Sequence, residues 1–533
     1  MALFYKEKLT PDASGVRFYL MDNILEYLEN TAALYGDKTA FIYPGMDISF
    51  GVLDRKARIL GSMLISGDHI LPVRTGEAVA FYMEKNVEAL VCMFGTVYAN
   101  GFYSFIDVRQ PSDRAFKVLS LLDPALIITD DENEEALRAM AGIDIMSSRI
   151  VNINNIMSTI SDKAPDDAAL QDRRREFYDT LPLYVNFTSG STGTPKGVVV
   201  GHRSVIDFIT VFTDTFGIDS SDTLANQAPF DFDVSVKDIY SGIFTGATVC
   251  LIPRPYFTNP TVLMDYICDN DVTTVIWAVS AMCFVSIMNA LDYRTPEKLD
   301  KIMFSGEIMP VKQLNKWKKY LPSATYVNLY GPTEITCNCT YHILDREYEK
   351  DELLPIGIPF RNEKVFLLDD NDMIVSDPGI EGEICVAGSC LALGYYKDPE
   401  KTAQVFTNNP VNKAFEERIY RTGDLGMYLE DGSLVYTSRK DFQIKHMGQR
   451  VELGEIEVSA MSLNDVSRAC CLYDEKRQKL ILFYSGGMDK EDVNEELKKK
   501  LPPYMIPQKT IPLDDFPMNK NGKIDRNALK ELI

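Results

Sequence analysis

Along the first two thirds of the chain, segments whose hydrophobic pattern predicts a helix alternate with segments whose pattern predicts a strand. Met21 to Leu34 has apolar residues three or four apart and stops before Gly36, which predicts a helix. Apolar runs at Glu77–Met83 and Gly101–Asp107 predict strands, and Val87–Ala99 between them predicts a helix. Because strands and helices alternate in this way, we expect an α/β fold with largely parallel strand pairing.

The pattern changes toward the C-terminus. From Lys364 onward the segments VFLLD, GEICVAG, RIYRTGD and LVYTS predict short alternating strands and therefore a β-rich subdomain. We expect residues 1–438 to form a large N-terminal domain, in which αβ layered subdomains are closed by this β-rich subdomain. Residues 439–533 should form a small α+β C-terminal domain.

Two connecting segments carry weaker patterns. Ser158 to Arg175 is polar, charged and poorly periodic, which predicts a solvated linker. Ser204 to Phe216 has helical periodicity, and Ser204 is the expected N-cap because its hydroxyl can accept a bond from a free backbone N–H.

Composition limits the classes of protein to consider. The chain has 533 residues, of which 46% are hydrophobic and 25% charged, as in soluble globular proteins. Its net charge of −22 argues against non-specific binding to nucleic acid or to an anionic membrane, since both are polyanions. The N-terminus lacks an apolar signal core, and the apolar run Val275–Leu291 is too interrupted to span a membrane.

The cysteines suggest a reducing compartment. The chain has 10 cysteines but no CxxC pair and only 4 histidines, so we expect neither a disulfide framework nor a zinc site. Cys337 and Cys339 fit a strand with a buried thiol better than a ligand pair. We expect a cytoplasmic protein.

A glycine-rich loop is the strongest chemical feature. Thr188–Gly197 reads TSGSTGTPKG between two apolar runs that predict strands. Backbone N–H groups, hydroxyls and the ammonium of Lys196 together suit phosphate oxygens. The Walker A spacing fails because Pro195 precedes Lys196, which argues against a P-loop NTPase.

This loop and seven further strings resemble the adenylate-forming (AMP-binding) enzymes, in particular the stand-alone amino-acid adenylation domains of nonribosomal peptide synthesis. The resemblance extends from about Ile48 to Asn527, with the strings in the family's order. They are GFYSFIDVRQPSDR from Gly101, FDFDVSVKDIY from Phe230, NLYGPTE from Asn328, GEICVAGSCLALGY from Gly382, YRTGDLG from Tyr420, RKDFQIKHMGQRVELGEIE from Arg439 and NKNGKIDR from Asn519.

The resemblance implies that ATP and Mg²⁺ are bound. It places Asn328 and Tyr330 at the adenine, Asp424 at the ribose with Arg439 in support, and Glu334 at Mg²⁺, a hard ion that prefers oxygen. The nucleotide-binding residues that it implies are Thr188, Ser189, Gly190, Ser191, Thr192, Gly193, Lys196, Asn328, Tyr330, Gly331, Thr333, Asp424 and Arg439.

Catalysis and movement are implied by the last two strings. Lys523 matches the lysine that bridges the substrate carboxylate and the α-phosphate, with Thr188, Lys196 and Glu334 at the triphosphate. Asp441 falls at the family's hinge between a large domain and a mobile small domain. Gly448 lies in the loop that approaches the thiol acceptor.

Asp233 separates the branches of the superfamily. In the amino-acid branch, the aspartate at this place pairs with the substrate's α-ammonium, whereas acyl- and aryl-CoA ligases, the alternative enzymes, have no need of it. Aligned by motif, the substrate-binding residues are Asp233, Val234, Lys237, Trp277, Met303, Ser305, Gly306, Leu329, Cys337 and Asn338. Trp277 and Met303 are bulky and should shorten the cavity.

The identity of the amino acid stays open. The first expectation is a small one, such as alanine, serine, cysteine or glycine. The strings MFSGEIMP and DFQIKHMG are also similar to D-alanine–carrier-protein ligases, but Ser305 stands where those commonly have cysteine, which leaves chirality open. If Lys237 points inward, it favours aspartate or glutamate; if outward, it is a solvated lysine.

The expected reaction is formation of an aminoacyl-adenylate with release of pyrophosphate, then transfer to a carrier protein's phosphopantetheine thiol. The chain ends 7 residues after Arg526, so we expect the carrier to be a separate protein. Lys498–Lys500 is a candidate contact for an acidic carrier or simply a solvated helix end. A nucleotide-binding regulator without activity is the alternative class, but Lys196, Glu334, Asp424 and Lys523 are all present. Oligomeric state is not indicated.

Replacing Lys523 tests the implied catalytic lysine. We expect Lys523→Ala to lower amino-acid-dependent pyrophosphate exchange by several orders of magnitude, because positive charge at the α-phosphate is lost in the transition state. Circular dichroism should show an unchanged fold. Near-normal exchange would mean that this lysine does not take part in adenylate formation.

Overall fold

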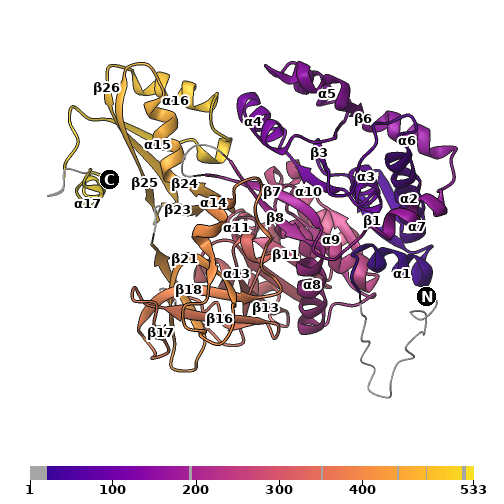
Figure 1. Cartoon of the computed structure of the whole chain (residues 1–533). Coiled ribbons are helices and arrows are strands. Elements are labelled where there is room, and N and C mark those ends of the chain that lie inside the picture. The colour runs from indigo at the N-terminus through magenta and orange to yellow at the C-terminus, as the bar shows by residue number, and fades with distance from the viewer. Residues whose placement is uncertain (1–20, 191–194, 350–351, 441–442, 476, 519–523) are drawn as a thin grey trace.

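The computed structural model describes residues 21–190, 195–349, 352–440, 443–475, 477–518 and 524–533 (Figure 1). Two twisted sheets and the helices around them make up most of the molecule, and a β-rich subdomain and a small C-terminal domain lie at one side. The predicted α/β class is therefore confirmed. Helix α1 (Leu25–Tyr35), strand β3 (Ala78–Tyr82) and helix α3 (Val87–Tyr98) lie where the hydrophobic pattern placed them.

The first sheet has the strand order β15-β14-β13-β12-β11-β9-β10-β1-β2. Its central strands are parallel, and β2, β14 and β15 pair antiparallel at the two ends. The strands are β1 (Thr39–Tyr43), β2 (Met46–Ser49), β9 (Thr223–Asn226), β10 (Thr248–Leu251), β11 (Thr274–Ala278), β12 (Lys301–Ser305), β13 (Thr325–Tyr330), β14 (Thr340–Ile343) and β15 (Ile358–Pro359).

The second sheet has the order β19-β8-β7-β4-β3-β5-β6. Strands β7 and β8 form an antiparallel hairpin in which Thr188 pairs with Lys196, so the glycine-rich segment is the hairpin's connection. The strands, besides β3, are β4 (Phe102–Phe105), β5 (Leu126–Thr129), β6 (Ile150–Asn152), β7 (Pro182–Thr188), β8 (Lys196–Gly201) and β19 (Gly394–Tyr395).

Helices cover both faces of these sheets. The largest core cluster joins the facing sides of the two sheets through α1, α2, α3, α8 and α9. A second cluster packs α10 to α13 on the first sheet's other face, and a third packs α4 and α5 on the second sheet's other face. The bounds are α2 (Phe50–Ser66), α4 (Ser112–Leu122), α5 (Glu134–Arg138), α6 (Ile153–Ser161), α7 (Asp167–Arg174), α8 (His202–Phe216), α9 (Val234–Thr245), α10 (Pro260–Asp269), α11 (Val279–Ile287), α12 (Ala290–Tyr293) and α13 (Val311–Tyr320), with 3₁₀ turns η1 (Ile143–Arg149), η2 (Arg254–Thr258) and η3 (Thr333–Ile335).

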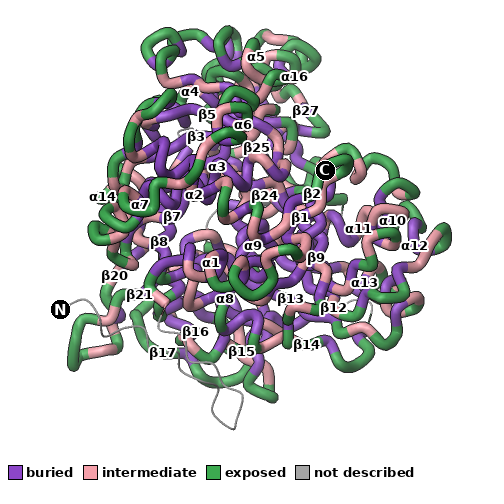
Figure 2. The backbone as a smooth tube through the Cα atoms, turned by 90° about the vertical axis from the view of Figure 1, so that its right-hand side faces the viewer, coloured by how far each residue is buried: buried purple, intermediate pink, exposed green. Residues whose placement is uncertain are grey.

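The β-rich subdomain follows as predicted. Its strands are β16 (Glu363–Leu368), β17 (Ile374–Val375), β18 (Glu381–Gly388), β20 (Phe406–Asn408), β21 (Arg418–Tyr428) and β22 (Leu434–Arg439), with helix α14 (Pro399–Val405). Burial is concentrated in the sheets and in the helices between them, and exposure at the outer loops (Figure 2).

The C-terminal domain begins after β22. A hairpin, β23 (Gln443–His446) and β24 (Gln449–Glu452), precedes a sheet of β25 (Val466–Asp474), β26 (Lys479–Gly486) and β27 (Lys509–Pro512). Its helices are α15 (Leu453–Met461), α16 (Lys490–Lys498) and α17 (Arg526–Lys530), with the 3₁₀ turn η4 (Pro503–Met505). Among the helices that the structure describes, none has the length and apolar character needed to cross a membrane.

Two local predictions are wrong. The segment expected to be a solvated linker contains the end of α6 and all of α7, and α7 packs against α2 and α3. Asp166 caps α7, and Arg173 donates to the carbonyls of Val73 and Ala99, so polar contacts hold a helix whose periodicity is weak. Ser204 is not the N-cap of α8, because the helix starts at His202 after Gly201; its hydroxyl donates instead to the carbonyl of Leu391.

His202, the first residue of α8, is a buried titratable group that faces the start of α1. Its exposed fraction is 2%, and its Nδ1 accepts a hydrogen bond from the backbone N–H of Ile24 at 3.3 Å. Burial, assisted by the charge of Arg174, lowers its pKa to about 3. The unfolded chain, with an ordinary histidine pKa, therefore takes up a proton at higher pH than the folded chain, so folding stability falls as pH drops below about 6.5.

We expect this histidine to cost about 2 kcal/mol of stability between pH 7.5 and pH 5. Urea titrations followed by tryptophan fluorescence report on the large domain, because both tryptophans, Trp277 and Trp317, lie in it. In His202→Gln, whose amide oxygen can still accept from Ile24, the loss of unfolding free energy over this range should shrink by that amount. An unchanged loss would show that His202 is not the titrating group.

Candidate active site

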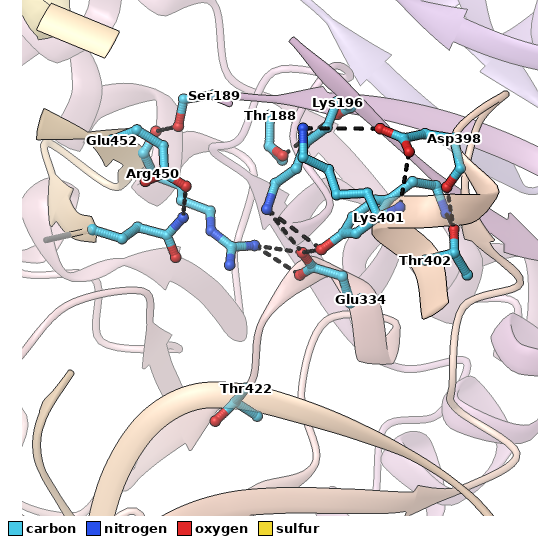
Figure 3. Close-up of polar contacts among 12 residues, drawn as sticks. Thr188, Ser189, Lys196, Glu334, Asp398, Lys401, Thr402, Thr422, Arg450 and Glu452 are labelled. Atoms are coloured by element: carbon cyan, nitrogen blue, oxygen red, sulfur yellow. Dashed lines mark hydrogen bonds and ion pairs between the residues drawn. The ribbon is translucent and has the colours of Figure 1, made fainter. Parts of the chain in front are cut away.

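The candidate site lies where the β7–β8 hairpin, the end of β13 and the C-terminal hairpin β23–β24 meet (Figure 3). After Tyr330 the chain leaves β13 through Gly331 and Pro332 into the short turn η3, which carries Glu334. A Cβ on Gly331 would lie 2.5 Å from Cα of Asn338. Only glycine therefore lets this turn pack against the segment that follows it.

Glu334 is fully buried and surrounded by cationic and hydroxyl donors. The Arg450 Nη1 contacts its two carboxylate oxygens at 2.8 and 2.7 Å, and the hydroxyl of Tyr395 donates to Oε1 at 2.7 Å. Lys196 Nζ lies 3.5 Å from Oε1. Burial alone would raise the pKa of Glu334, but Arg450 and Lys196 hold it well below its usual range, so the group is a carboxylate.

Lys196 is positioned by the register of the hairpin. Its backbone carbonyl accepts from the Thr188 hydroxyl at 3.4 Å, and its ammonium lies 5.0 Å from the centre of the Tyr395 ring. Burial, with repulsion from Arg450, lowers the pKa of Lys196 to about 8. Ser189 and Gly190 are described at the start of the loop, whereas Ser191, Thr192 and Gly193 lie outside the described residues.

The groups expected at adenine and ribose lie together. The Tyr330 hydroxyl donates to Asp424 Oδ2 at 2.6 Å, and Arg439 pairs with the other oxygen of the same carboxylate. Lys445 of the C-terminal hairpin lies 6.0 Å over the Tyr330 ring. Asn328 Nδ2 donates to the carbonyl of Pro355 at 2.8 Å. The structure thus brings Tyr330, Asp424 and Arg439 into one cluster, with Asn328 at its edge.

Asp233 lies beside the phosphate-handling groups. It precedes α9 and has an exposed fraction of 6%, and Thr333, the residue next to Glu334, is among the polar groups that act on its carboxylate. Burial raises the pKa of Asp233, and the Thr333 hydroxyl and the charge of Lys237 oppose that shift. A cation bound beside Asp233 would stabilise its charged form.

Lys237 points inward. One turn into α9, it is 1% exposed, and its ammonium donates to Asn338 Oδ1 at 2.8 Å and to the Ser305 hydroxyl at 3.3 Å. The segment that brings Asn338 here has positive φ at Thr336 (53°) and Cys337 (77°), which is uncommon for residues other than glycine. The Cys337 thiol donates to the carbonyl of Asp233 at 3.1 Å, so this turn is tied to the start of α9.

The assignment of Trp277 to the substrate pocket is corrected. In the register of β11 and β12, Trp277 pairs with Phe304, and Ala278 pairs with Ser305. Trp277 packs on Phe257 and its indole donates to the Ala225 carbonyl at 2.8 Å, on the face covered by α10 to α13. Successive side chains of a strand face opposite sides, so an alignment shifted by one residue selects the wrong face of the sheet. The residue of β11 that lies beside Ser305 is Ala278.

The other expected pocket positions share one neighbourhood. Met303 and Leu329 point into the same core cluster as the first turns of α9, and Val234 is buried at the helix start. Gly306 follows β12 with φ of 99°, a conformation that favours glycine.

The C-terminal hairpin enters the site with its tip. Met447 and Gly448 both have positive φ, 54° and 76°, as a two-residue hairpin turn requires. Burial raises the pKa of Glu307, and the backbone N–H groups of Gly448 and Met447 oppose that shift, so this carboxyl lies near the hairpin tip. A Cβ on Gly448 would lie 3.2 Å from Cβ of Ala278, so the tip packs closely against the end of β11.

Two contacts that the sequence did not predict fix this hairpin. The Ser189 hydroxyl donates to the backbone carbonyl of Arg450 at 2.8 Å. Farther along, Arg114 at the start of α4 pairs with Glu455 of α15, and both are buried. Arg114, Tyr395 and Arg450 all lie within recognisable strings, but their contacts join residues 61 to 341 positions apart in the chain, which a linear pattern does not show.

Lys523 and Asp441 lie outside the described residues. The segments flanking Lys523 are described: Met518 bridges to Ile524, and Arg526 donates to the Cys471 carbonyl and pairs with Glu457, all within the C-terminal domain. The hairpin β23–β24, rather than these flanking segments, makes the described contacts of the C-terminal domain with Glu334.

The residues next to the phosphate loop fit a Mg²⁺ ion that takes one ligand from the protein, the carboxylate of Glu334. Mg²⁺ binds through one or two carboxylates together with phosphate and water oxygens, and Glu334 is an ionised carboxylate next to the phosphate loop. Among the residues that the structure describes, no group of three or more His, Cys, Asp or Glu side chains is placed to hold a metal ion. Most ligands of such an ion would therefore come from the nucleotide and from water.

Comparison with known proteins agrees with this geometry. A model of the family described as AMP-binding enzyme matches residues 28–396. The chain is 30% identical over 530 residues to the L-proline–[L-prolyl-carrier protein] ligase of Streptomyces coelicolor, covering 95% of this chain and 96% of that protein. It is also 27% identical over 534 residues to part of tyrocidine synthase 1 of Brevibacillus parabrevis, covering 98% of this chain but 46% of that protein.

A solved structure shows the same fold. Holo-PA1221, a nonribosomal peptide synthetase protein with adenylation and PCP domains, superposes with a TM-score of 0.80 at 22% identity, over 96% of this chain and 84% of that one. At this identity the likeness supports the fold alone, whereas the family match and the 30% identical ligase go further. The chain therefore belongs to the AMP-binding enzyme family, among the ligases related to nonribosomal-peptide-synthetase adenylation domains.

Proposed function

We propose that this ligase uses ATP to activate an amino acid as its aminoacyl-adenylate and then transfers it to the phosphopantetheine thiol of a carrier protein. The observation that carries the proposal is the position of Asp233. A buried carboxylate, separated by the Thr333 hydroxyl from the Glu334 cluster, offers a counter-ion for an α-ammonium next to the groups that handle phosphate. A simple fatty or aryl acid would leave that carboxylate without a partner.

In the first step, a carboxylate oxygen of the amino acid attacks the α-phosphorus of ATP, and magnesium pyrophosphate leaves. We propose that Lys196 and the hydroxyls of Thr188 and Ser189 receive the β- and γ-phosphate oxygens, and that Asp424 accepts from the ribose hydroxyls. Lys523 is proposed to place positive charge at the α-phosphate. Mg²⁺, held by Glu334, would supply charge neutralisation for the leaving pyrophosphate.

In the second step, a thiol attacks the acyl carbonyl, and AMP leaves. We propose that the domains comprise residues 1–438 and 439–533 and reorient about Asp441 between the steps. The hairpin tip at Met447 and Gly448 packs against the end of β11, and the hairpin, rather than the described segments that flank Lys523, contacts Glu334; this supports the proposal that the present arrangement serves thiol transfer.

We further propose that the amino acid has an acidic side chain. Lys237 faces inward, and both of its hydrogen-bond partners, Ser305 and Asn338, are neutral. Burial lowers the pKa of Lys237, so a bound carboxylate would stabilise its charged form. A small neutral amino acid, the first expectation from the sequence, is the competing outcome.

Counting buried charges supports an acidic substrate. Behind Lys237, Lys85 is held by Asn226, Gln227 and Ala228, and Asn226 in turn donates to Asp238. Lys85, Lys237, Asp233 and Asp238, the buried members of this group, carry two positive and two negative charges when ionised, and the charges of Glu84, Asp231 and Lys445 act on them from less buried positions. The α-ammonium of the substrate adds one positive charge to this group, which a side-chain carboxylate near Lys237 would neutralise.

The carrier protein is proposed from relatives whose names include a carrier or PCP domain. The lysine run at the end of α16 offers little support for docking an acidic carrier. Lys498 and Lys499 pair with Glu495 and Glu496 one turn earlier, and Lys500 contacts the Ser462 hydroxyl. These contacts favour a solvated helix end at this place.

Pyrophosphate exchange across the amino acids tests the substrate proposal. We expect aspartate or glutamate to give the highest kcat/KM, and Lys237→Met to reduce it by about 10²–10³-fold, because removing one partner of a buried ion pair costs about 3–5 kcal/mol. Exchange with neutral amino acids should rise relative to the acidic ones in this variant. Tryptophan fluorescence serves as the control for folding.

Three outcomes distinguish the proposal of an acidic substrate from that of amino-acid activation and from that of adenylation itself. If alanine, serine, glycine or cysteine is preferred and Lys237→Met leaves that preference unchanged, the acidic substrate is wrong while amino-acid activation stands. If only acetate or benzoate supports exchange, the role of Asp233 and the amino-acid proposal both fail. Absence of any exchange with a folded protein would contradict adenylation itself.

Because Trp277 faces away from the pocket and Ala278 lies beside Ser305, substitutions at these two residues should have opposite effects. Trp277→Phe should lower the free energy of unfolding by about 1–3 kcal/mol, because the Ala225 carbonyl loses its buried donor, while the KM for the amino acid changes little. Ala278→Val should raise that KM, since the added methyl groups lie beside Ser305. The reverse pattern would place Trp277, rather than Ala278, in the pocket.

A further inference from the structure

A lysine from the second sheet holds the segment that leads to Asp233. Lys85 follows β3 and is 5% exposed. Its ammonium lies within hydrogen-bond distance of four oxygens: the backbone carbonyls of Asn226, Gln227 and Ala228 at 3.0, 2.9 and 3.0 Å, and the Asn226 side-chain oxygen at 2.7 Å. Asn226 is the last residue of β9 in the first sheet. Lys85 therefore joins the two sheets where parallel strands end, which is where α/β folds commonly bind ligands.

The side chain of Asn226 carries this connection on to α9. Its Oδ1 accepts from Lys85, and its Nδ2 donates to Asp238 Oδ2 at 2.8 Å. Asn226 and Asp238 are both fully buried. Among the residues that the structure describes, no group hydrogen-bonds to the other oxygen of Asp238. The two charges are therefore bridged by one amide, which is held at both ends and cannot rotate without losing a buried hydrogen bond.

These contacts enclose the connection between β9 and α9. Residues 227–233 form this connection, and Asp233 is its last residue. Because it lies outside any strand or helix, its path depends on side-chain contacts with its backbone. Lys85 holds its beginning, and the bond from Asn226 to Asp238 joins that beginning to the second turn of the helix that follows. The place of Asp233 therefore depends on where Lys85 fixes the start of the connection.

Neutralising Asp238 does not by itself explain this arrangement. A lysine needed only for its charge would satisfy the carboxylate by direct contact, since an ion pair is strongest at short range. Here the ammonium is instead directed at three consecutive backbone carbonyls, and an amide lies between the two charges. Fully hydrogen-bonded polar groups inside a protein rigidify the segments that they join. Lys85 therefore acts on the path of the backbone as well as on the charge balance.

We propose that Lys85 is a positioning residue for amino-acid binding, because its contacts with residues 226–228 set the place of the Asp233 carboxylate. The inference rests on the proposed function, in which that carboxylate pairs with the substrate's α-ammonium. It adds to this function a residue of the other sheet on which the pairing depends. Lys85 itself binds backbone oxygens and not the substrate, so its loss should weaken amino-acid binding more than ATP binding.

Substitution by methionine tests this role, because Lys85→Met keeps the length of the side chain and removes the ammonium. Pyrophosphate exchange is measured with L-aspartate, L-glutamate, L-alanine and L-serine, and the best substrate of the wild type is used for every variant. We expect the KM for this amino acid to rise about 10–100-fold, the cost of misplacing a binding group by about 1 Å, and the KM for ATP to change less than about twofold. Amide hydrogen exchange of residues 227–235 should become faster.

Three further variants separate positioning from charge balance and from stability. Lys38→Met removes a lysine that donates to the carbonyls of Ser220 and of Gly246, the C-cap at the far end of α9, so it should lower stability without changing either KM. The double variant Lys85→Met/Asp238→Asn removes both charges of the bridged pair; it should unfold at higher urea than Lys85→Met but keep the raised amino-acid KM. Lys85→Arg, which retains N–H donors and charge, should lie closer to the wild type.

Each contrary result has a specific meaning. A Lys85→Met protein that is folded and has an unchanged amino-acid KM would overturn the proposal. So would a double variant whose KM returns to the wild-type value, because charge balance alone would then matter, or an equal rise of KM in Lys38→Met. If Lys85→Met does not fold, the double variant and Lys85→Arg supply the comparison. If the wild type shows no exchange with any amino acid, the proposed function fails, and hydrogen exchange alone decides whether Lys85 holds the connection.

Discussion

A carboxylate without access to water is the constraint on which the candidate site depends. Glu334 is fully buried, and an isolated charge in that position would be too costly to persist. Its partners come from three separate parts of the chain: Lys196 from the phosphate-loop hairpin, Tyr395 from β19, and Arg450 from the C-terminal domain. The contacts that neutralise this one carboxylate therefore connect the phosphate-loop hairpin, strand β19 and the C-terminal domain.

The neighbouring buried charges are arranged differently. Lys237 is fixed on α9 and faces the Ser305 hydroxyl and the Asn338 amide, and the strained turn through Thr336 and Cys337 delivers that amide. None of these three groups belongs to the C-terminal domain, although the charge of Lys445 in the C-terminal hairpin acts on Lys237. Under the proposed function, Asp233 and Lys237 would contact the amino acid, whereas Glu334 and Lys196 would serve the phosphates of the nucleotide.

Much of the fold could be predicted because it follows from local patterns. A continuous apolar run located β3, helical patterns located α1 and α3, and the change of pattern after Lys364 located the β-rich subdomain. The wrong predictions, at α7 and at Trp277, each have a local structural cause. Helix α7 is held by arginine contacts to backbone carbonyls and not by an apolar stripe. At Trp277 an alignment shifted by one residue chose the opposite face of β11, because successive strand residues face opposite sides.

The sequence by itself determined the family resemblance, the α/β class and the residue types available for phosphate and ammonium binding, because short motifs and periodicity are local properties. Tertiary structure decided which way Lys237 points, that Ala278 and not Trp277 adjoins Ser305, and that Arg450 reaches Glu334. Each of these depends on the distance between segments far apart in the chain. Such distances follow from how sheets and helices pack together, which no single stretch of sequence encodes.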